Sequence, residues 1–338
     1  IIDTAGINDM GILGDKRINS TNKIKRRIDA AIYVCDINRK EELDSYNIFR
    51  DEKIPHILVF NKCTSDNLKF SKDIITNYPD AIFFKNGSDI NKIHAKLSDL
   101  LTSQKQSTDS FLSGLLPPGS HVILVTPIDS EAPKGRWILP QVQVLRDCLD
   151  NGISSSVCRE HELVSTLSNL RKVDLVITDS QAFSYVNEVI SREIPLTSFS
   201  ILLASVKGDF RRYVESVSVI PDLTDRSNIL ILEGCTHNST HEDIGKHKIP
   251  DMLKKHTGKD FSFTHYSGYD FPDDLSSYSL AIQCGSCMLN RREIISRERL
   301  LQVAGVPITN YGVILAWGSG ILERAIEIFN NENQKSGY

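Results

Sequence analysis

Three cysteines stand out in this sequence because they follow two apolar runs that are typical of buried strands. Cys235 comes just after the run at 228–233, and the pair Cys284 and Cys287, spaced Cys-Gly-Ser-Cys, follows the run at 279–283. The residues between the runs leave room for a helix, so we expect the two strands to be parallel neighbours. Ligands of open parallel sheets bind beyond the carboxyl ends of the strands. The spacing therefore predicts that three thiols meet at one edge of a sheet.

Three convergent thiolates indicate a metal site that leaves one position to another donor. We also expect Cys287 to open a helix, whose N-terminus would favour its thiolate form. A cubane iron–sulfur cluster takes four ligands, usually thiolates, and its iron accepts other donors when a thiol is missing. The loop after Cys235 offers such donors in His237, His241, Glu242 and Asp243. This choice of exchangeable donors favours an iron–sulfur cluster.

Two alternatives remain open at this point. A structural zinc ion would be satisfied by the three cysteines together with His237 or His241. A disulfide between Cys284 and Cys287 would leave no metal site at all. Glu242, for its part, also suits the start of a helix near Asp243.

The composition is that of a soluble globular protein that works in a reducing compartment. The chain has 338 residues, of which 40% are hydrophobic and 24% charged, and its formal net charge is −4. This charge does not indicate a basic surface for binding nucleic acid. No apolar run reaches the length of a membrane span, about 18–20 residues. No secretory signal is visible, so we expect a cytoplasmic location. Four further cysteines read as free core thiols: Cys35, Cys63, Cys148 and Cys158.

Strand–helix alternation throughout predicts an α/β fold of three domains with mainly parallel sheets. We place the domains at 1–105, 106–208 and 209–338, and we detect no internal repeat. In the middle domain we expect a strand at 198–203. Its first helix should bury the apolar face formed by four residues, Leu139, Val142, Leu145 and Leu149.

The N-terminal block carries two elements that are typical of a Ras-like P-loop GTPase domain. Asp3-Thr-Ala-Gly6 follows an apolar start, as does the Asp-x-x-Gly element that meets Mg²⁺ and the γ-phosphate. Asn61-Lys62 follows the predicted strand at 56–60, where such proteins read guanine. Thr64 replaces the aspartate of Asn-Lys-x-Asp, and no Gly-x-x-x-x-Gly-Lys-Ser/Thr loop occurs in the sequence. We therefore expect the chain as it stands to bind GTP weakly.

These features together resemble the HydF family of [FeFe]-hydrogenase maturation GTPases. The resemblance covers essentially the whole chain and is strongest from residue 115 onward. It is carried by the cysteines and by the segments 115–119, 127–136, 178–183, 195–200, 284–293 and 304–312. The family often has a histidine directly before Cys-x-x-Cys, whereas this chain has Gln283, so we expect the fourth ligand to come from the Cys235 loop.

The resemblance implies a GTP-binding domain lacking its P-loop, a dimerization domain and a cluster-binding domain, in that order. Asp3, Gly6, Asn61 and Lys62 would contact GTP and Mg²⁺. Cys235, Cys284 and Cys287 would bind a [4Fe-4S] cluster, with Glu242 or His237 as the candidate fourth ligand. The protein would be a scaffold that carries a diiron subcluster precursor from radical-SAM maturases to apo-hydrogenase, with GTP hydrolysis as a switch.

Two further expectations complete this interpretation. A homodimer should form through the middle domain, with segment 194–203 extending a sheet across a two-fold axis. The main rival function is a GTP-regulated zinc-binding module, which would lack the visible absorbance of an iron–sulfur protein. A radical or redox enzyme is disfavoured because the Cys-x3-Cys-x2-Cys spacing of radical-SAM enzymes is missing.

Overall fold

The computed structural model confirms an α/β architecture built on three sheets whose described strand pairs are all parallel. The chain divides into two compact units, residues 1–108 and 109–338. The described residues are 2–4, 20–21, 23–39, 41–51, 54–64, 72–85, 87–104, 110–128, 137–234 and 244–330. In this part of the chain no helix has the length and apolar character needed to cross a membrane.

The first unit contains a three-stranded sheet in the order β1-β2-β3. The central strand is buried on both faces, since Leu58 and Phe60 pack against α2 while Ile57 and Val59 pack against α5. This explains its continuous apolar run. The strands are β1 (Ala31–Asp36), β2 (His56–Asn61) and β3 (Ile82–Phe83). The helices are α2 (Glu41–Asp51), α4 (Lys72–Asn77), η1 (Gly87–Asp89) and α5 (Ile90–Gln104).

The second unit begins with a four-stranded sheet in the order β5-β4-β6-β7. Along β4, Val122 and Leu124 face one core cluster while Ile123 and Val125 face the other. The strands are β4 (His121–Val125), β5 (Ser154–Cys158), β6 (Leu175–Thr178) and β7 (Leu196–Ser198). The helices are α6 (Leu139–Asp150), η2 (Glu160–Glu162), α7 (Leu163–Ser168), η3 (Ser180–Ala182), α8 (Phe183–Val189) and α9 (Phe199–Lys207).

A second four-stranded sheet follows in the same unit, in the order β11-β10-β8-β9. Its strands are β8 (Asn228–Glu233), β9 (Ser262–Ser267), β10 (Leu280–Gln283) and β11 (Ile308–Asn310). Helical segments α10 (Phe210–Glu215) and η4 (Ser216–Asp222) precede it. The other helical segments are η5 (Ile244–Lys248), α11 (Ile249–Thr257), α12 (Arg291–Val303), α13 (Tyr311–Gly318) and α14 (Leu322–Asn330).

The two sheets of the second unit share one topology, which the sequence analysis missed. Read in chain order, both place their strands second-first-third-fourth. The segment around the fourth strand also recurs in sequence, as Pro-Leu-Thr-Ser-Phe at 195–199 and Pro-Ile-Thr-Asn-Tyr at 307–311. In both copies the residue after threonine caps the next helix, since Ser198 Oγ accepts from Ile201 N and Asn310 Oδ1 accepts from Gly312 N. The second unit is therefore a structural duplication.

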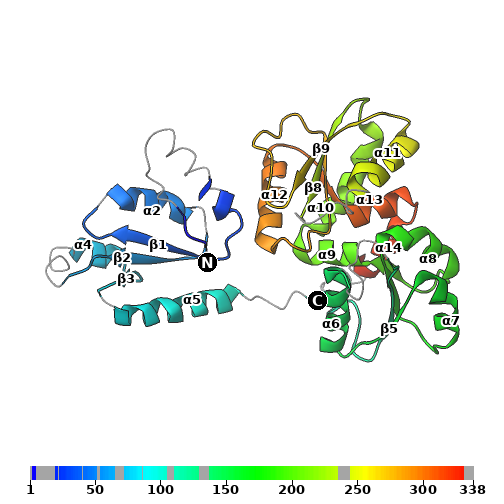
Figure 1. Ribbon diagram of the computed structural model, residues 1–338, viewed down its shortest axis with the longest axis horizontal. Coiled ribbons are helices and arrows are strands. Elements are labelled where there is room, and N and C mark those ends of the chain that lie inside the picture. Colours follow the sequence, from blue (N-terminus) through cyan, green and yellow to red (C-terminus); the bar gives the residue numbers. More distant parts are fainter. Residues whose placement is uncertain are drawn as a thin grey trace. The chain divides into compact units, whose positions relative to one another are not determined.

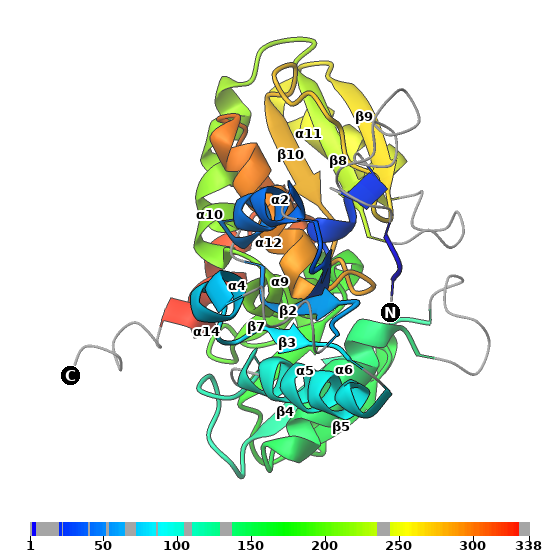
Figure 2. The same ribbon diagram turned by 90° about the vertical axis from the view of Figure 1, so that its left-hand side faces the viewer.

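The expected strand at 198–203 is wrong, because residues from Phe199 onward form helix α9. Strand β7 stops at its cap, Ser198, and the β-branched and aromatic residues that follow lie in the core. Figures 1 and 2 show α9 within the second unit, where it contacts α6 and β7 of the first sheet and α12, α13 and β11 of the second. The apolar character of α9 therefore reflects its burial between the two sheets.

Candidate functional site

The strands that precede the predicted metal ligands are parallel neighbours, as expected. β8 pairs with β10, and Leu232 lies opposite Gln283 in the register. Both strands are fully buried along their apolar runs. Their carboxyl ends therefore place the segment that leads into Cys235 beside the segment that begins with Cys284.

Cys284 lies in a preformed pocket of backbone amides. Gly234 N donates to Cys284 Sγ at 3.0 Å, and Ser286 N donates to the same sulfur at 3.2 Å. A Cβ on Gly234 would lie 3.0 Å from Ser286 Cα, so a larger residue there would require the backbone at Ser286 to shift. Burial raises the pKa of the Cys284 thiol above its ordinary value, while the two amide hydrogen bonds act in the opposite direction.

Cys287 lies in a turn and does not open a helix, which corrects the sequence expectation. Leu289 N donates to Ser286 O at 3.0 Å, and α12 begins only at Arg291 with Asn290 as its N-cap. Ser286 has a φ of 50°, a backbone conformation that non-glycine residues seldom adopt. The helix therefore begins four residues beyond Cys287, and its N-terminus does not explain thiolate formation there.

The described part of the site suits a thiolate-bound metal. Neither Cys284 nor Cys287 is in a disulfide, so the disulfide alternative is not formed. The amide hydrogen bonds to Cys284 are of the kind that stabilise metal-bound thiolates. Gly234 directly precedes Cys235, but Cys235 itself, His237, His241, Glu242 and Asp243 lie outside the described residues. Among the residues that are described, no group of three or more His, Cys, Asp or Glu side chains forms a metal site by itself.

Two side chains that the sequence analysis did not select hold the backbone around Cys284 and Cys287. Asn310, at the end of β11, donates through Nδ2 to Gln283 O and Cys284 O, each at 3.2 Å. Lys207, at the end of α9, donates to carbonyls of the Cys287 turn. An N-cap signal before an apolar helix could have revealed Asn310. Nothing in the sequence marks Lys207, which is 80 residues from Cys287.

The remaining cysteines behave as core thiols, in agreement with the sequence analysis. Cys35, Cys63, Cys148 and Cys158 are all buried and free. Burial raises the pKa of both Cys35 and Cys148 to about 12, so these thiols stay protonated.

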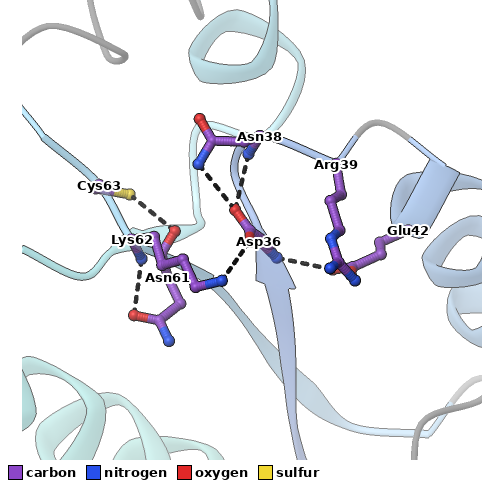
Figure 3. Close-up of polar contacts among 7 residues, drawn as sticks. All are labelled: Asp36, Asn38, Arg39, Glu42, Asn61, Lys62 and Cys63. Carbon is purple, nitrogen blue, oxygen red and sulfur yellow. Dashed lines mark hydrogen bonds and ion pairs between the residues drawn. The ribbon is translucent and has the colours of Figure 1, made fainter.

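Of the predicted nucleotide residues, Asn61 is the last residue of β2 in the first unit and Lys62 follows it. Figure 3 shows Lys62, after β2, reaching Asp36 at the end of β1, with 2.8 Å between Lys62 Nζ and Asp36 Oδ2. This lysine, and then the Asn38 amide, lowers the pKa of the Asp36 carboxyl. Asn61 is exposed, and its Oδ1 accepts from Lys62 N at 2.7 Å. Asp3 is exposed in irregular structure, and Gly6 lies outside the described residues.

Family models decide the identity of the second unit. The hydrogen maturase F dimerization domain matches residues 111–208, and the hydrogen maturase F tetramerization domain matches residues 211–328. The chain belongs to the HydF family. The two HydF domains divide the second unit between its two sheets, so each copy of the duplicated fold corresponds to one domain that the family names for oligomerization.

Comparisons beyond the family add little. No curated protein matches the chain. A solved structure of a 5,10-methylenetetrahydrofolate dehydrogenase from the silkworm Bombyx mori aligns with 14% identity over 70% of this chain and 95% of that one. Its TM-score is 0.21, too low for a shared fold to be inferred.

Proposed function

We propose that this HydF-family chain is a scaffold in [FeFe]-hydrogenase maturation that holds a [4Fe-4S] cluster on Cys235, Cys284 and Cys287. When bound, such a cluster supplies an iron whose fourth position can take a donor that exchanges. The chain's own residues would hold the backbone around Cys284 and Cys287, and backbone amides donate hydrogen bonds to the Cys284 sulfur. Through the open position the protein would carry a diiron precursor made by radical-SAM maturases and pass it to apo-hydrogenase.

One observation carries this proposal. The amide of Gly234, the residue before Cys235, is 3.0 Å from Cys284 Sγ. The carboxyl end of β8 therefore already touches the thiol that follows β10, although the two cysteines are 49 residues apart in sequence. This contact supports the convergence of the three thiols.

Metal analysis of anaerobically purified protein tests the proposal. We expect about four iron and four sulfide per chain and a brown colour with visible absorbance, as a cubane cluster requires. Zinc without visible absorbance would instead support the zinc-binding module. Absence of both metals after anaerobic reconstitution with iron and sulfide would overturn the scaffold function.

The GTP switch is the other part of the proposal, and the first unit supports it only in part. Among the described strands, β1 is at the edge of its sheet, and its Ile32 and Val34 are 45% and 55% exposed. Apolar side chains on an edge strand favour a further strand or helix as cover. Asn61 and Lys62 hold positions at a strand end where GTPases read guanine, and Asp36 fixes the lysine.

We predict that the 338-residue chain binds GTP weakly or not at all. The reason is chemical, since no phosphate loop in this sequence supplies the backbone amides and lysine that hold the β- and γ-phosphates. Titration with a GTP analogue and Mg²⁺ by calorimetry measures this directly. Micromolar affinity would show that the N-terminal block has been misassigned.

Dimerization requires a different surface from the one expected at 194–203. Phe199, Ile201 and Leu203 are buried, and the β7 edge packs against α14. The other edge strand of this sheet is β5, on which Val157 is 41% exposed. On α6 the expected core face is wrong for Leu139, Val142 and Leu149, which are exposed, whereas Leu145 packs partly buried against the core. The residues that α6 buries fully are Gln141, Val144 and Cys148.

The exposed apolar face of α6 is therefore a natural dimer contact. Leu139, Val142 and Leu149 are 39%, 46% and 65% exposed, and α6 contacts β5. We infer that a second copy covers this face and the open β5 edge together, in keeping with the family's dimerization domain.

Glutamate at Val142 or Leu149 should weaken the dimer by about tenfold or more, because each change removes apolar burial and places a charge in the contact. Light scattering across a concentration series measures the effect. Val164→Glu is the matched control, since Val164 is 58% exposed on α7 of the same domain. If Val164→Glu dissociated the dimer and Leu149→Glu did not, the contact would lie elsewhere.

A further inference from the structure

The turn that carries Cys287 is held by a lysine from the other half of the duplicated unit. Lys207 Nζ donates to Ser286 O at 2.8 Å, to Leu289 O at 3.1 Å and to Cys287 O at 3.2 Å. An ammonium group has three donors, which matches the three carbonyls. Lys207 is the last residue of α9 and lies within the dimerization domain, whereas the turn lies within the tetramerization domain. The contact therefore crosses from one domain to the other.

This contact fixes the direction of the peptide groups around Cys287. The described chain contains no cis peptide, and in a trans peptide the C=O and N–H groups point in opposite directions. Because the carbonyls of Ser286 and Cys287 point to Lys207, the amides of Cys287 and Met288 point away from it. Backbone amides that are oriented together favour anions.

The N-terminal end of α9 holds the same loop from another side. Ser200 Oγ donates to Asn310 Oδ1 at 3.2 Å, and Asn310 in turn binds the Cys284 carbonyl. A Cβ built on Gly285 would lie 3.6 Å from Ser200 Oγ. One buried helix of the first copy therefore contacts both ends of the Cys284–Cys287 loop in the second copy.

The duplication provides an internal comparison for Lys207. Aligning 194–204 with 306–316 places Ser319 opposite Lys207, and α13 contacts η3 as α9 contacts the cysteine loop. The loop of the first copy reads Asp179-Ser-Gln-Ala182 and contains no thiol. The lysine is thus present at the loop with thiols, and serine takes its place at the loop without them.

We propose that Lys207 is a positioning residue of the metal site, which holds the Cys287 turn closed before and after metal binding. The inference rests on the proposed function for the identity of the metal. The contact of Lys207 with the three carbonyls of the Cys287 turn, which we call the clamp, is already present in the metal-free protein. Its positive charge would also favour three thiolates gathered at one place. The site would then need both domains, although all of its cysteines come from one of them.

Alkylation of the metal-free protein tests the clamp without any cluster. In Lys207→Met, Cys287 should react with iodoacetamide about tenfold faster, the factor expected when a hydrogen bond to a charged group is lost from a locally opening segment. Peptide mass spectrometry resolves each cysteine. The matched control is Lys259→Met, because Lys259 Nζ also donates to two carbonyls, Pro221 O and Leu223 O, at 2.8 and 2.6 Å.

The cluster provides the second measurement. After anaerobic reconstitution, Lys207→Met should lose iron to a chelator about tenfold faster than wild type, while Lys259→Met should match wild type. Lys207→Arg, which keeps the charge and several donors, should recover much of the difference, and Lys207→Gln should recover less. Lys207→Gln also serves as the second variant if the methionine protein fails to fold.

The outcomes separate this inference from the proposed function. If wild type binds no iron but Cys287 alkylation still rises in Lys207→Met, the clamp stands and the scaffold function fails. If wild type holds a cluster, and the Lys207 variants match it in both alkylation and iron release, the clamp is overturned. Equal effects in Lys207→Met and Lys259→Met would also overturn it, because the loss would then reflect general destabilisation.

Discussion

Replacing Cys235, Cys284 or Cys287 by serine is expected to remove most of the iron from the reconstituted protein. Serine offers a hydroxyl that is far less acidic and a harder donor than a thiolate, so it binds cluster iron poorly. With only three thiols in the set, no spare cysteine replaces the one that is lost. Iron and sulfide per chain, measured after anaerobic reconstitution and desalting, should fall well below half of the wild-type value.

A cysteine outside the site provides the matched control. Cys148 is fully buried in the same unit, and its pKa is raised to about 12 by burial, so Cys148→Ser tests the same chemical change without touching the metal site. This variant should keep its iron even if it is less stable. Full iron retention in Cys284→Ser would contradict the three-thiol site.

The fourth ligand gives a contrasting expectation. Glu242→Ala should leave the cluster in place and change its electron paramagnetic resonance line shape, since a carboxylate is a weaker ligand of this iron than thiolate. His237→Ala provides the comparison. Whichever variant alters both the line shape and the response to added imidazole identifies the donor.

The parts of the site that the sequence predicted are those fixed by local pattern. Apolar runs that end at Glu233 and Gln283 give two buried strands, and the length between them gives a parallel crossover, so the proximity of the two segments follows. The same reasoning predicted most strands of the three sheets, but it missed β9 and placed the strand found at 196–198 at 198–203. It also identified the four core thiols, because an isolated cysteine in an apolar run is most often buried.

The incorrect predictions concern segments in which a helix-capping residue and the local residue composition indicated different secondary structures. Residues 198–203 have high strand propensity, but Ser198 caps a helix, and burial of α9 on several sides explains its apolar residues without a strand. Likewise, the hydrogen bond from Glu293 N to Asn290 Oδ1 marks the start of α12. The sequence analysis overlooked this capping signal and placed the start of the helix at Cys287. On α6, helical periodicity gives more than one possible buried face, and tertiary packing buries Gln141, Val144 and Cys148 while Leu139, Val142 and Leu149 are exposed.

Other features of the site depend on contacts between distant residues. Lys207 reaches its carbonyl partners across about 80 residues of sequence, and only the packing of the two copies brings them together. The duplication itself is visible in sequence only at 195–199 and 307–311 once the strand orders have been compared. Such features follow from tertiary structure and leave no periodic pattern in the sequence.

The second large effect is expected in helix α12, which supports the cysteine turn from its C-terminal side. Arg297 is 1% exposed, and its Nε donates to Glu293 Oε1 at 2.8 Å while Nη2 donates to Gly268 O at 2.6 Å. Its guanidinium also lies 5.7 Å from the centre of the Phe271 ring. Glu293 is 3% exposed, so this is a buried ion pair within α12, while the hydrogen bond to Gly268 O joins the helix to the loop after β9.

Arg297→Met should destabilise the protein by about 3–5 kcal/mol, because it leaves the Glu293 carboxylate buried without its partner. The corresponding fall in the thermal midpoint is roughly 10 °C for a unit of this size. Differential scanning calorimetry of the metal-free protein measures it. Arg211→Met, which breaks an exposed pair with Glu215, is the control and should change the stability by less than about 1 kcal/mol.

The double variant Arg297→Met/Glu293→Gln decides whether the unpaired charge is the cause. If the cost comes from burying a lone carboxylate, neutralising Glu293 should restore a large part of the lost stability, because exchange of a whole buried pair for uncharged residues is often close to neutral. A double variant no more stable than Arg297→Met would show instead that packing on Phe271 and the bond to Gly268 O hold the helix. In that case the ion pair would contribute little, and the position of α12, and with it the end of the cysteine turn, would depend on the shape of the arginine side chain.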